Sequence, residues 1–132
     1  MNPFTGIEHV GIAARDTTRL AEWYKNTFGW TEVMRSGSTP PVFFLATPSK
    51  DMVEIIPART SPGREKDNFD QGYVHLAIGA SDYDAACRRI IEAGGRLEGD
   101  PINANGTKVQ FFRDPEGNLL HIIKRPKPLV ER

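Results

Sequence analysis

The segment Gly6-Ile-Glu-His9-Val-Gly-Ile12 decides the fold, because it returns in the second half of the chain as Gly72-Tyr-Val-His75-Leu-Ala-Ile78. A candidate helix N-cap follows each copy at the same distance, Asp16 after the first and Asp82 after the second. A unit that recurs at a fixed period within a chain does not bury its apolar face alone, so its copies pack together. The sequence therefore predicts two related modules.

The last strands of the two copies correspond as well. Met52-Val-Glu54-Ile-Ile56 matches Leu119-Leu-His121-Ile-Ile123 at nearly the same spacing along the chain. All three histidines of the chain and one glutamate thus fall at matching points of the repeat. These four potential metal ligands are His9, Glu54, His75 and His121.

Hydrophobic periodicity predicts the order strand, helix and three strands in each copy. In the first copy we expect a helix that begins after Asp16 and ends at Gly29, with strands at residues 6–14, 30–35, 42–47 and 52–56. In the second copy we expect a helix from Ser81 or Asp82 through Ala93, with strands at residues 72–79, 96–100, 107–113 and 118–124. The predicted fold class is α+β, with two βαβββ modules that pair into a curved mixed sheet and carry their helices on its outer face.

The length of the chain, 132 residues, is that of one compact domain. We therefore expect a single domain over residues 1–132, with module one at 5–57, a linker at 58–71, module two at 72–125 and a tail at 126–132. The linker carries the charged run Arg64-Glu-Lys-Asp67. Such a run is typical of a solvated loop, although loops of this kind can also cover a site.

The composition gives no reason to expect a polyanionic partner. Seventeen basic and seventeen acidic side chains cancel, so neither nucleic acid nor an anionic membrane is favoured, and a small-molecule substrate remains open. The single Cys87 cannot form an internal disulfide. The N-terminal residues lack the features of a secretory signal, and no stretch reaches the roughly 20 apolar residues of a membrane span. These features predict a cytoplasmic protein.

The candidate ligands are expected on the face of each sheet that is turned away from the helices. Side chains alternate between the two faces of a strand, so His9 shares a face with Gly11, while Val10 and Ile12 point the other way. Each of the other three candidates is likewise flanked by apolar residues. The apolar residues must meet the helices, which leaves the ligands on the concave face beside small residues.

Three histidines and one carboxylate suit a first-row divalent ion such as Zn, Ni, Fe or Mn, and do not suit Mg or Ca, which prefer oxygen ligands. The alternative is that each histidine is an isolated, hydrogen-bonded residue of a strand. The placement of all three at equivalent points of the repeat favours the metal site. The identity of the metal stays open.

The chain resembles the vicinal oxygen chelate superfamily, which includes glyoxalase I, bleomycin-resistance proteins and extradiol dioxygenases. The resemblance spans nearly the whole chain and rests on Ile7-Glu-His9-Val-Gly-Ile12, Phe28-Gly-Trp30, Met52-Val-Glu54-Ile55, Val74-His75-Leu-Ala-Ile78 and Phe112-Arg-Asp-Pro-Glu-Gly-Asn-Leu-Leu-His121. The turn Arg113-Asp-Pro-Glu-Gly-Asn118 is the most specific of these for the fold.

The resemblance implies a glyoxalase-like fold, a small-molecule substrate and a homodimer. It also implies that His9, Glu54, His75 and His121 hold the metal, and that Glu54 or His121 moves a proton. In members similar to glyoxalase I the last ligand is usually a glutamate, and His121 departs from that pattern. The substrate, any thiol cofactor and the swapped or unswapped form of the dimer stay open.

Three functions follow as hypotheses. The first is a metal-dependent lyase or isomerase that chelates a small substrate through neighbouring oxygens. The second is an iron-dependent extradiol-type dioxygenase, which typically leaves more coordination positions free than three histidines and a glutamate would. The third is a non-catalytic drug-binding resistance protein, which usually lacks the ligand set. The sequence favours the first, with His121 and Glu54 as the catalytic candidates.

Overall fold

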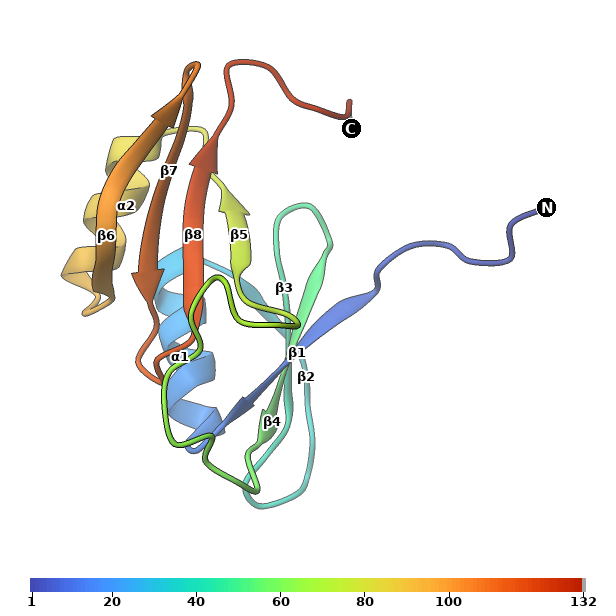
Figure 1. Ribbon diagram of the computed structural model, residues 1–132. Helices are drawn as coiled ribbons and strands as arrows, with labels where there is room; N and C mark the ends of the chain where they lie inside the picture. Colours follow the sequence, from blue (N-terminus) through green and yellow to red (C-terminus); the bar gives the residue numbers. More distant parts are fainter. Residues whose placement is uncertain (132) are drawn as a thin grey trace. The chain divides into compact units, whose positions relative to one another are not determined.

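The computed structural model describes residues 1–131 of the 132-residue chain. The chain folds into two compact units, one from Met1 to Ser61 and one that starts at Pro62. Each unit contains one helix and four strands (Figure 1). The first unit contains β1 (His9–Ala14), α1 (Thr17–Phe28), β2 (Thr31–Arg35), β3 (Phe43–Ala46) and β4 (Met52–Pro57). The second contains β5 (Leu76–Gly79), α2 (Tyr83–Glu92), β6 (Arg96–Ala104), β7 (Thr107–Arg113) and β8 (Leu119–Lys124).

The two helices begin at the predicted caps. The side chain of Asp16 accepts a hydrogen bond from the backbone N–H of Arg19, and the side chain of Asp82 accepts one from Ala85. Each cap satisfies an N–H group that the first turn of a helix leaves without a partner. Helix α1 ends at Gly29, whose φ of 70° is the left-handed conformation that glycine adopts most easily. Neither helix of residues 1–131 has the length and apolar character of a membrane span.

The two sheets have the same topology. Their strand orders are β1-β4-β3-β2 and β5-β8-β7-β6, and the first pair of each is parallel while the other pairs are antiparallel. Gly11 is paired with Glu54 in the first sheet, and Ala77 is paired with His121 in the second. The register therefore places the matching points of the sequence repeat at matching points of the two sheets. The α+β class with two βαβββ units and mixed sheets is confirmed.

The first strand of each unit starts later than predicted. Strand β1 begins at His9 instead of residue 6, and β5 begins at Leu76 instead of residue 72. A strand extends only as far as its partner strand. Strand β1 is paired with β4, and β4 itself begins at Met52, which is paired with His9. His9 is thus the first residue of its strand, and His75 lies just before β5.

The apolar core of each unit comes from alternate residues of the strands. Phe43 and Leu45 of β3 are fully buried in the first unit, and Phe112, Leu120 and Ile122 have the same burial in the second. Helix α1 packs on β3 and β4, and α2 packs on β8. Because side chains alternate along a strand, the residues between these core positions point to the opposite face of the sheet.

An ion-pair cluster joins the end of α1 to β2. Glu32 accepts hydrogen bonds from Arg35 and from Lys25, with N···O distances of 2.9 and 3.0 Å. The Arg35 guanidinium, followed by the Lys25 ammonium, lowers the pKa of Glu32 to about 2.

This cluster makes a small contribution to stability that depends on pH. The contribution is present above the ordinary glutamate pKa of 4.5 and is lost as the pH falls toward 2, because the unfolded chain takes up the proton first. Replacing Glu32 by glutamine removes it. We expect thermal unfolding midpoints of wild type and Glu32→Gln to differ by a few degrees at pH 6 and to converge near pH 2, and an equal gap at both pH values would contradict this account.

Candidate metal centre

The first unit brings together two of the four predicted ligands. His9 at the start of β1 and Glu54 on β4 lie on one face of the sheet, with 3.5 Å between His9 Nε2 and Glu54 Oε1. Their side chains retain 35% and 25% of their exposure, so both are accessible from this face. The other ring nitrogen of His9, Nδ1, lies 2.8 Å from Glu8 Oε1. The Nε2 atom of His9 and the carboxylate of Glu54 are therefore the groups of this unit that are available to bind a metal ion.

The second unit brings together the other two. The rings of His75 and His121 have centroids 4.5 Å apart and an interplanar angle of 31°. His121 lies on β8 and is only 7% exposed, whereas His75, before β5, is exposed. The Nδ1 atom of His75 lies 2.6 Å from Asn68 Oδ1. Two imidazoles are thus adjacent on one face of the sheet.

The buried ring of His121 has nitrogens that make no hydrogen bond within residues 1–131. Both of its nitrogens are buried and have no hydrogen-bond partner among the described residues. Burial, followed by the charges of His75 and Arg125, lowers the pKa of His121 to about 4. The ring is therefore neutral at pH 7 and keeps a lone pair. A buried polar atom without a partner costs about 1–3 kcal/mol, which a bound cation would offset.

A phenylalanine lies beside the candidate ligands in each unit. Phe44 on β3 is paired with Glu54, and its ring meets the His9 ring edge-on with centroids 5.1 Å apart. Phe111 on β7 is paired with His121, and its ring meets the His121 ring edge-on at 4.8 Å and the His75 ring edge-on at 5.6 Å between centroids. The two phenylalanines are related by the same offset along the chain that relates Glu54 to His121. Each unit therefore has a phenylalanine beside its pair of candidate ligands.

The turn before β8 sets the position of the strand that carries His121. Asp114 is buried, and its Oδ1 accepts hydrogen bonds from the backbone N–H groups of Glu116 and Asn118 at 2.8 and 3.0 Å. Gly117 has a φ of 87°, which an L side chain adopts only with strain. This confirms the tight turn that Pro115 and Gly117 predict.

The predicted ligands are thus placed as two pairs, one in each unit. Within residues 1–131 no group of three or more His, Cys, Asp or Glu side chains is close enough to hold a metal ion. The convergence of the two pairs on one ion stays a prediction. The site residues are compatible with a transition metal, because such ions prefer neutral imidazole donors and His121 has unused nitrogens.

The sequence alone did not assign three residues to this site: Phe44, Phe111 and Asn68. Phe44 and Phe111 follow or precede core phenylalanines, Phe43 and Phe112, and residue type alone does not separate them. The offset that they share with the ligand pair was the signal that could have found them. Asn68 comes from the linker, and no periodicity of the sequence connects it to His75.

Comparisons with known proteins identify the family. A family model described as Glyoxalase/Bleomycin resistance protein/Dioxygenase superfamily matches residues 6–122. A probable lactoylglutathione lyase from Synechocystis is 30% identical over 121 residues, which cover 88% of this chain and 92% of that protein.

Two solved structures share the fold. A glyoxylase/bleomycin resistance protein/dioxygenase domain from Frankia has a TM-score of 0.76 at 21% identity and covers 95% of this chain and 96% of that one. The fosfomycin resistance protein FosX from Listeria monocytogenes, solved with Mn(II) and 1S,2S-dihydroxypropylphosphonic acid, has a TM-score of 0.71 at 18% identity, with 90% and 89% coverage. The family match and the repeated βαβββ topology lead to one conclusion: the chain belongs to the Glyoxalase/Bleomycin resistance protein/Dioxygenase superfamily.

Proposed function

We propose that this protein is a divalent-metal-dependent lyase or isomerase of the glyoxalase type, in which His9, Glu54, His75 and His121 hold one Zn, Ni, Fe or Mn ion. The observation that carries the proposal is the buried ring of His121, whose two nitrogens have no hydrogen-bond partner among the described residues and which lies beside a second imidazole. An isolated structural histidine would be expected to have its polar atoms satisfied.

The proposed chemistry follows from the donor set. When bound, the ion would act as a Lewis acid on two neighbouring oxygens of a small substrate, which makes the adjacent C–H proton more acidic. A base must then remove that proton from one carbon and return it to the neighbouring one. The ring of His121 has a pKa lowered to about 4 and would have a lone pair engaged as ligand, so it is a poor base. We assign the proton transfer to Glu54, whose carboxylate is accessible and adjacent to His9.

The glutamate can be tested as a base apart from its role as a ligand. Glutamine at position 54 keeps an oxygen that can coordinate but cannot take up a proton. We expect Glu54→Gln to retain a measurable metal content and to lose about 10²–10⁴-fold in kcat, which is the usual contribution of a general base. Metal content and kcat are measured on the same preparation.

The matched control is Glu8→Gln, because Glu8 is a largely exposed carboxylate beside His9, just before β1. We expect Glu8→Gln to change kcat far less than Glu54→Gln. Equal losses in the two variants, or full turnover in Glu54→Gln, would contradict the assignment of Glu54 as the base.

The substrate class can be tested with the compound named in the relatives. We propose that lactoylglutathione or a similar compound with neighbouring oxygens is formed or broken down at this site, because lactoylglutathione lyases match most of the chain. The assay follows the thioester absorbance of lactoylglutathione with the metal-loaded protein. Metal-dependent formation or breakdown supports the lyase proposal, whereas oxygen consumption with catechols in its place would assign the site to a dioxygenase.

The proposed assembly is a homodimer. Several large apolar side chains are exposed in the single chain at the N-terminal segment and before β5, and they include Phe4, Ile7, Phe69 and Tyr73. Exposed apolar surface of this kind is a common mark of an interaction site. Light scattering coupled to gel filtration distinguishes a dimer of 14.7 kDa chains from a monomer.

A further inference from the structure

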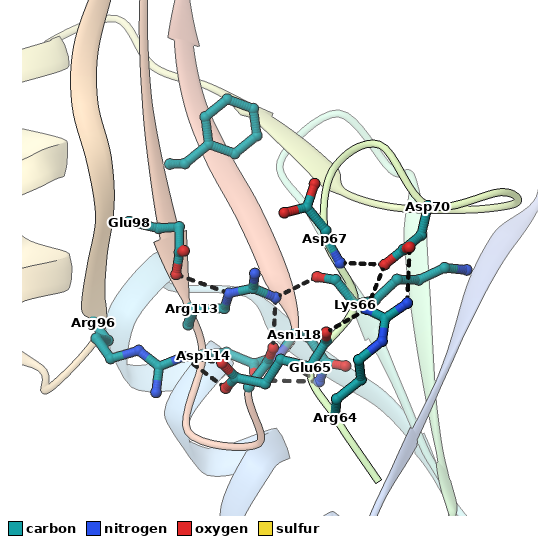
Figure 2. Close-up of polar contacts among 12 residues, drawn as sticks. Arg64, Glu65, Lys66, Asp67, Asp70, Arg96, Glu98, Arg113, Asp114 and Asn118 are labelled. Carbon is teal, nitrogen blue, oxygen red and sulfur yellow. Dashed lines mark hydrogen bonds and ion pairs between the residues drawn. The ribbon is translucent and has the colours of Figure 1, made fainter. Parts of the chain in front are cut away.

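The loop between the two repeats makes polar contacts with strands β6 and β7, some of them buried and some exposed. We call residues 64–70 the strap (Figure 2). Arg96 Nη2 on β6 donates to Glu65 Oε2 at 2.6 Å, and Arg113 Nη1 at the end of β7 donates to the carbonyl of Lys66 at 2.7 Å. Arg113 is itself buried. The strap therefore has a defined path along the second sheet.

Hydrogen bonds within the strap fix its shape. Arg64 makes a two-point ion pair with Asp70, with N···O distances of 2.8 and 2.9 Å. Asp70 also accepts a hydrogen bond from the backbone N–H of Asp67 at 2.6 Å. Figure 2 shows the contacts of Arg64 and of the Asp67 backbone with Asp70. The backbone on either side of Asn68 is thus held by charged contacts.

The strap reaches a candidate metal ligand through the side chain of Asn68. The oxygen Oδ1 of Asn68 lies 2.6 Å from Nδ1 of His75, and Asn68 is half-buried. An amide oxygen only accepts hydrogen bonds, so Nδ1 must carry the proton. In a neutral imidazole the lone pair is then on Nε2. The contact selects the tautomer that leaves Nε2 as the donor to a metal.

The first unit has an equivalent contact built differently. His9 Nδ1 lies 2.8 Å from Glu8 Oε1, so the histidine at each first-strand position has Nδ1 next to an oxygen acceptor. Glu8 is the preceding residue in the chain and is largely exposed, whereas Asn68 is separated from His75 in the sequence and depends on the path of the strap. In the second unit the acceptor for the histidine Nδ1 therefore comes from a loop, whereas in the first unit it comes from the preceding residue.

We propose that Asn68 is a positioning residue for the metal site: its amide oxygen holds His75 as the Nδ1–H tautomer, in the orientation set by the strap, so that Nε2 is free to coordinate. This inference rests on the proposed function, because it takes His75 to be a ligand. A hydrogen-bonded partner of a metal-bound histidine typically changes metal affinity by about 10- to 100-fold when it is removed.

The first experiment reads the tautomer in the metal-free protein. Long-range ¹H–¹⁵N NMR at about pH 8, above the ordinary imidazole pKa near 6.5, distinguishes Nδ1–H from Nε2–H, and a His75→Gln variant assigns the signals. We expect wild type and Asn68→Asp, which keeps an acceptor oxygen, to have the Nδ1–H form, and Asn68→Ala to populate the Nε2–H form. A wild-type His75 protonated on Nε2 would overturn the proposal.

The second experiment measures the dissociation constant for Zn²⁺ by competition with a chelating dye. We expect Asn68→Ala to bind about 10- to 100-fold more weakly than wild type, and Asn68→Asp to stay within a few-fold of it. The matched control is Lys66→Ala, because Lys66 is an exposed residue of the strap and its hydrogen bond with Arg113 is made by its backbone carbonyl. Equal effects of Asn68→Ala and Lys66→Ala would contradict a specific role for the amide.

The two experiments separate this inference from the function on which it rests. A protein that binds no Zn²⁺ but holds the Nδ1–H tautomer through Asn68 overturns the metal-dependent function and supports the positioning of His75 by Asn68. A protein that binds Zn²⁺ with no dependence of tautomer or affinity on residue 68 supports the metal site and overturns the role of Asn68.

Discussion

Replacement of His121 by leucine is expected to abolish metal binding and turnover while leaving the metal-free protein at least as stable as wild type. The loss of function follows because one of four ligands is removed, and even the partners of metal-bound histidines are worth about 10- to 100-fold in affinity. The retained stability follows because His121 buries two nitrogens that have no hydrogen-bond partner among the described residues. An apolar side chain of similar size removes their cost of about 1–3 kcal/mol each.

The measurement is a pair of denaturant titrations of metal-free wild type and His121→Leu, together with the Zn²⁺ dissociation constant of each. Leu120→Ala, at the neighbouring and fully buried position of β8, is the matched control, because it should lose stability and keep its ligands. A strong loss of metal-free stability in His121→Leu would contradict the account, since it would mean that the ring is satisfied within the fold.

Two adjacent phenylalanines on β7 are expected to respond differently to the same truncation. Phe112 is 0% exposed in the core, so Phe112→Ala should cost about 3–5 kcal/mol of unfolding free energy, a large part of the total for a domain of this size. Phe111 lies on the other face, against the rings of His121 and His75. Its truncation should cost clearly less stability and weaken binding at the site.

Urea titrations of the metal-free variants and Zn²⁺ affinities of the metal-loaded ones test this contrast. Phe44→Ala extends it to the first unit, since Phe44 is the repeat equivalent of Phe111 and contacts His9. Equal destabilisation by Phe111→Ala and Phe112→Ala would mean that both faces of β7 are core. Phe111 would then be a core residue and not part of the site.

The pairing of the ligands within each unit was predictable from the sequence. The repeat sets which strands correspond, and the alternation of side chains sets which face each residue occupies. For His9 and Glu54 these two rules are sufficient, because both lie on neighbouring strands with apolar residues on the opposite face. The helices were predictable for a local reason, since Asp16, Asp82 and Gly29 act within one turn of the chain.

The boundaries of β1 and β5 were not predictable by the same rules. The segment before His9 contains the apolar residues Phe4 and Ile7, yet a strand also needs a neighbour with free backbone groups, and β4 begins only at Met52. The extent of a strand therefore depends on where its partner begins, and that partner lies far away in the sequence.

The role of Asn68 was outside the reach of sequence patterns altogether. The charged run from Arg64 to Asp67 has the composition of a solvated loop, yet its neighbours in the fold come from β6, the end of β7 and the turn before β8. Gly117 lies against this segment, because a Cβ at that position would meet the carboxylate of Glu65. Contacts of this kind are set by tertiary structure, and no local propensity encodes them.

The central claim is that four side chains at matching points of the repeat bind one divalent ion. The most direct test is the metal content of the untagged protein, measured by mass spectrometry after purification and again after incubation with Zn, Ni, Fe or Mn and gel filtration. The account predicts about one divalent ion per chain in wild type and none in His75→Ala. A wild-type chain that retains no ion under any of these conditions would contradict the claim and would make a non-catalytic binding protein the better description.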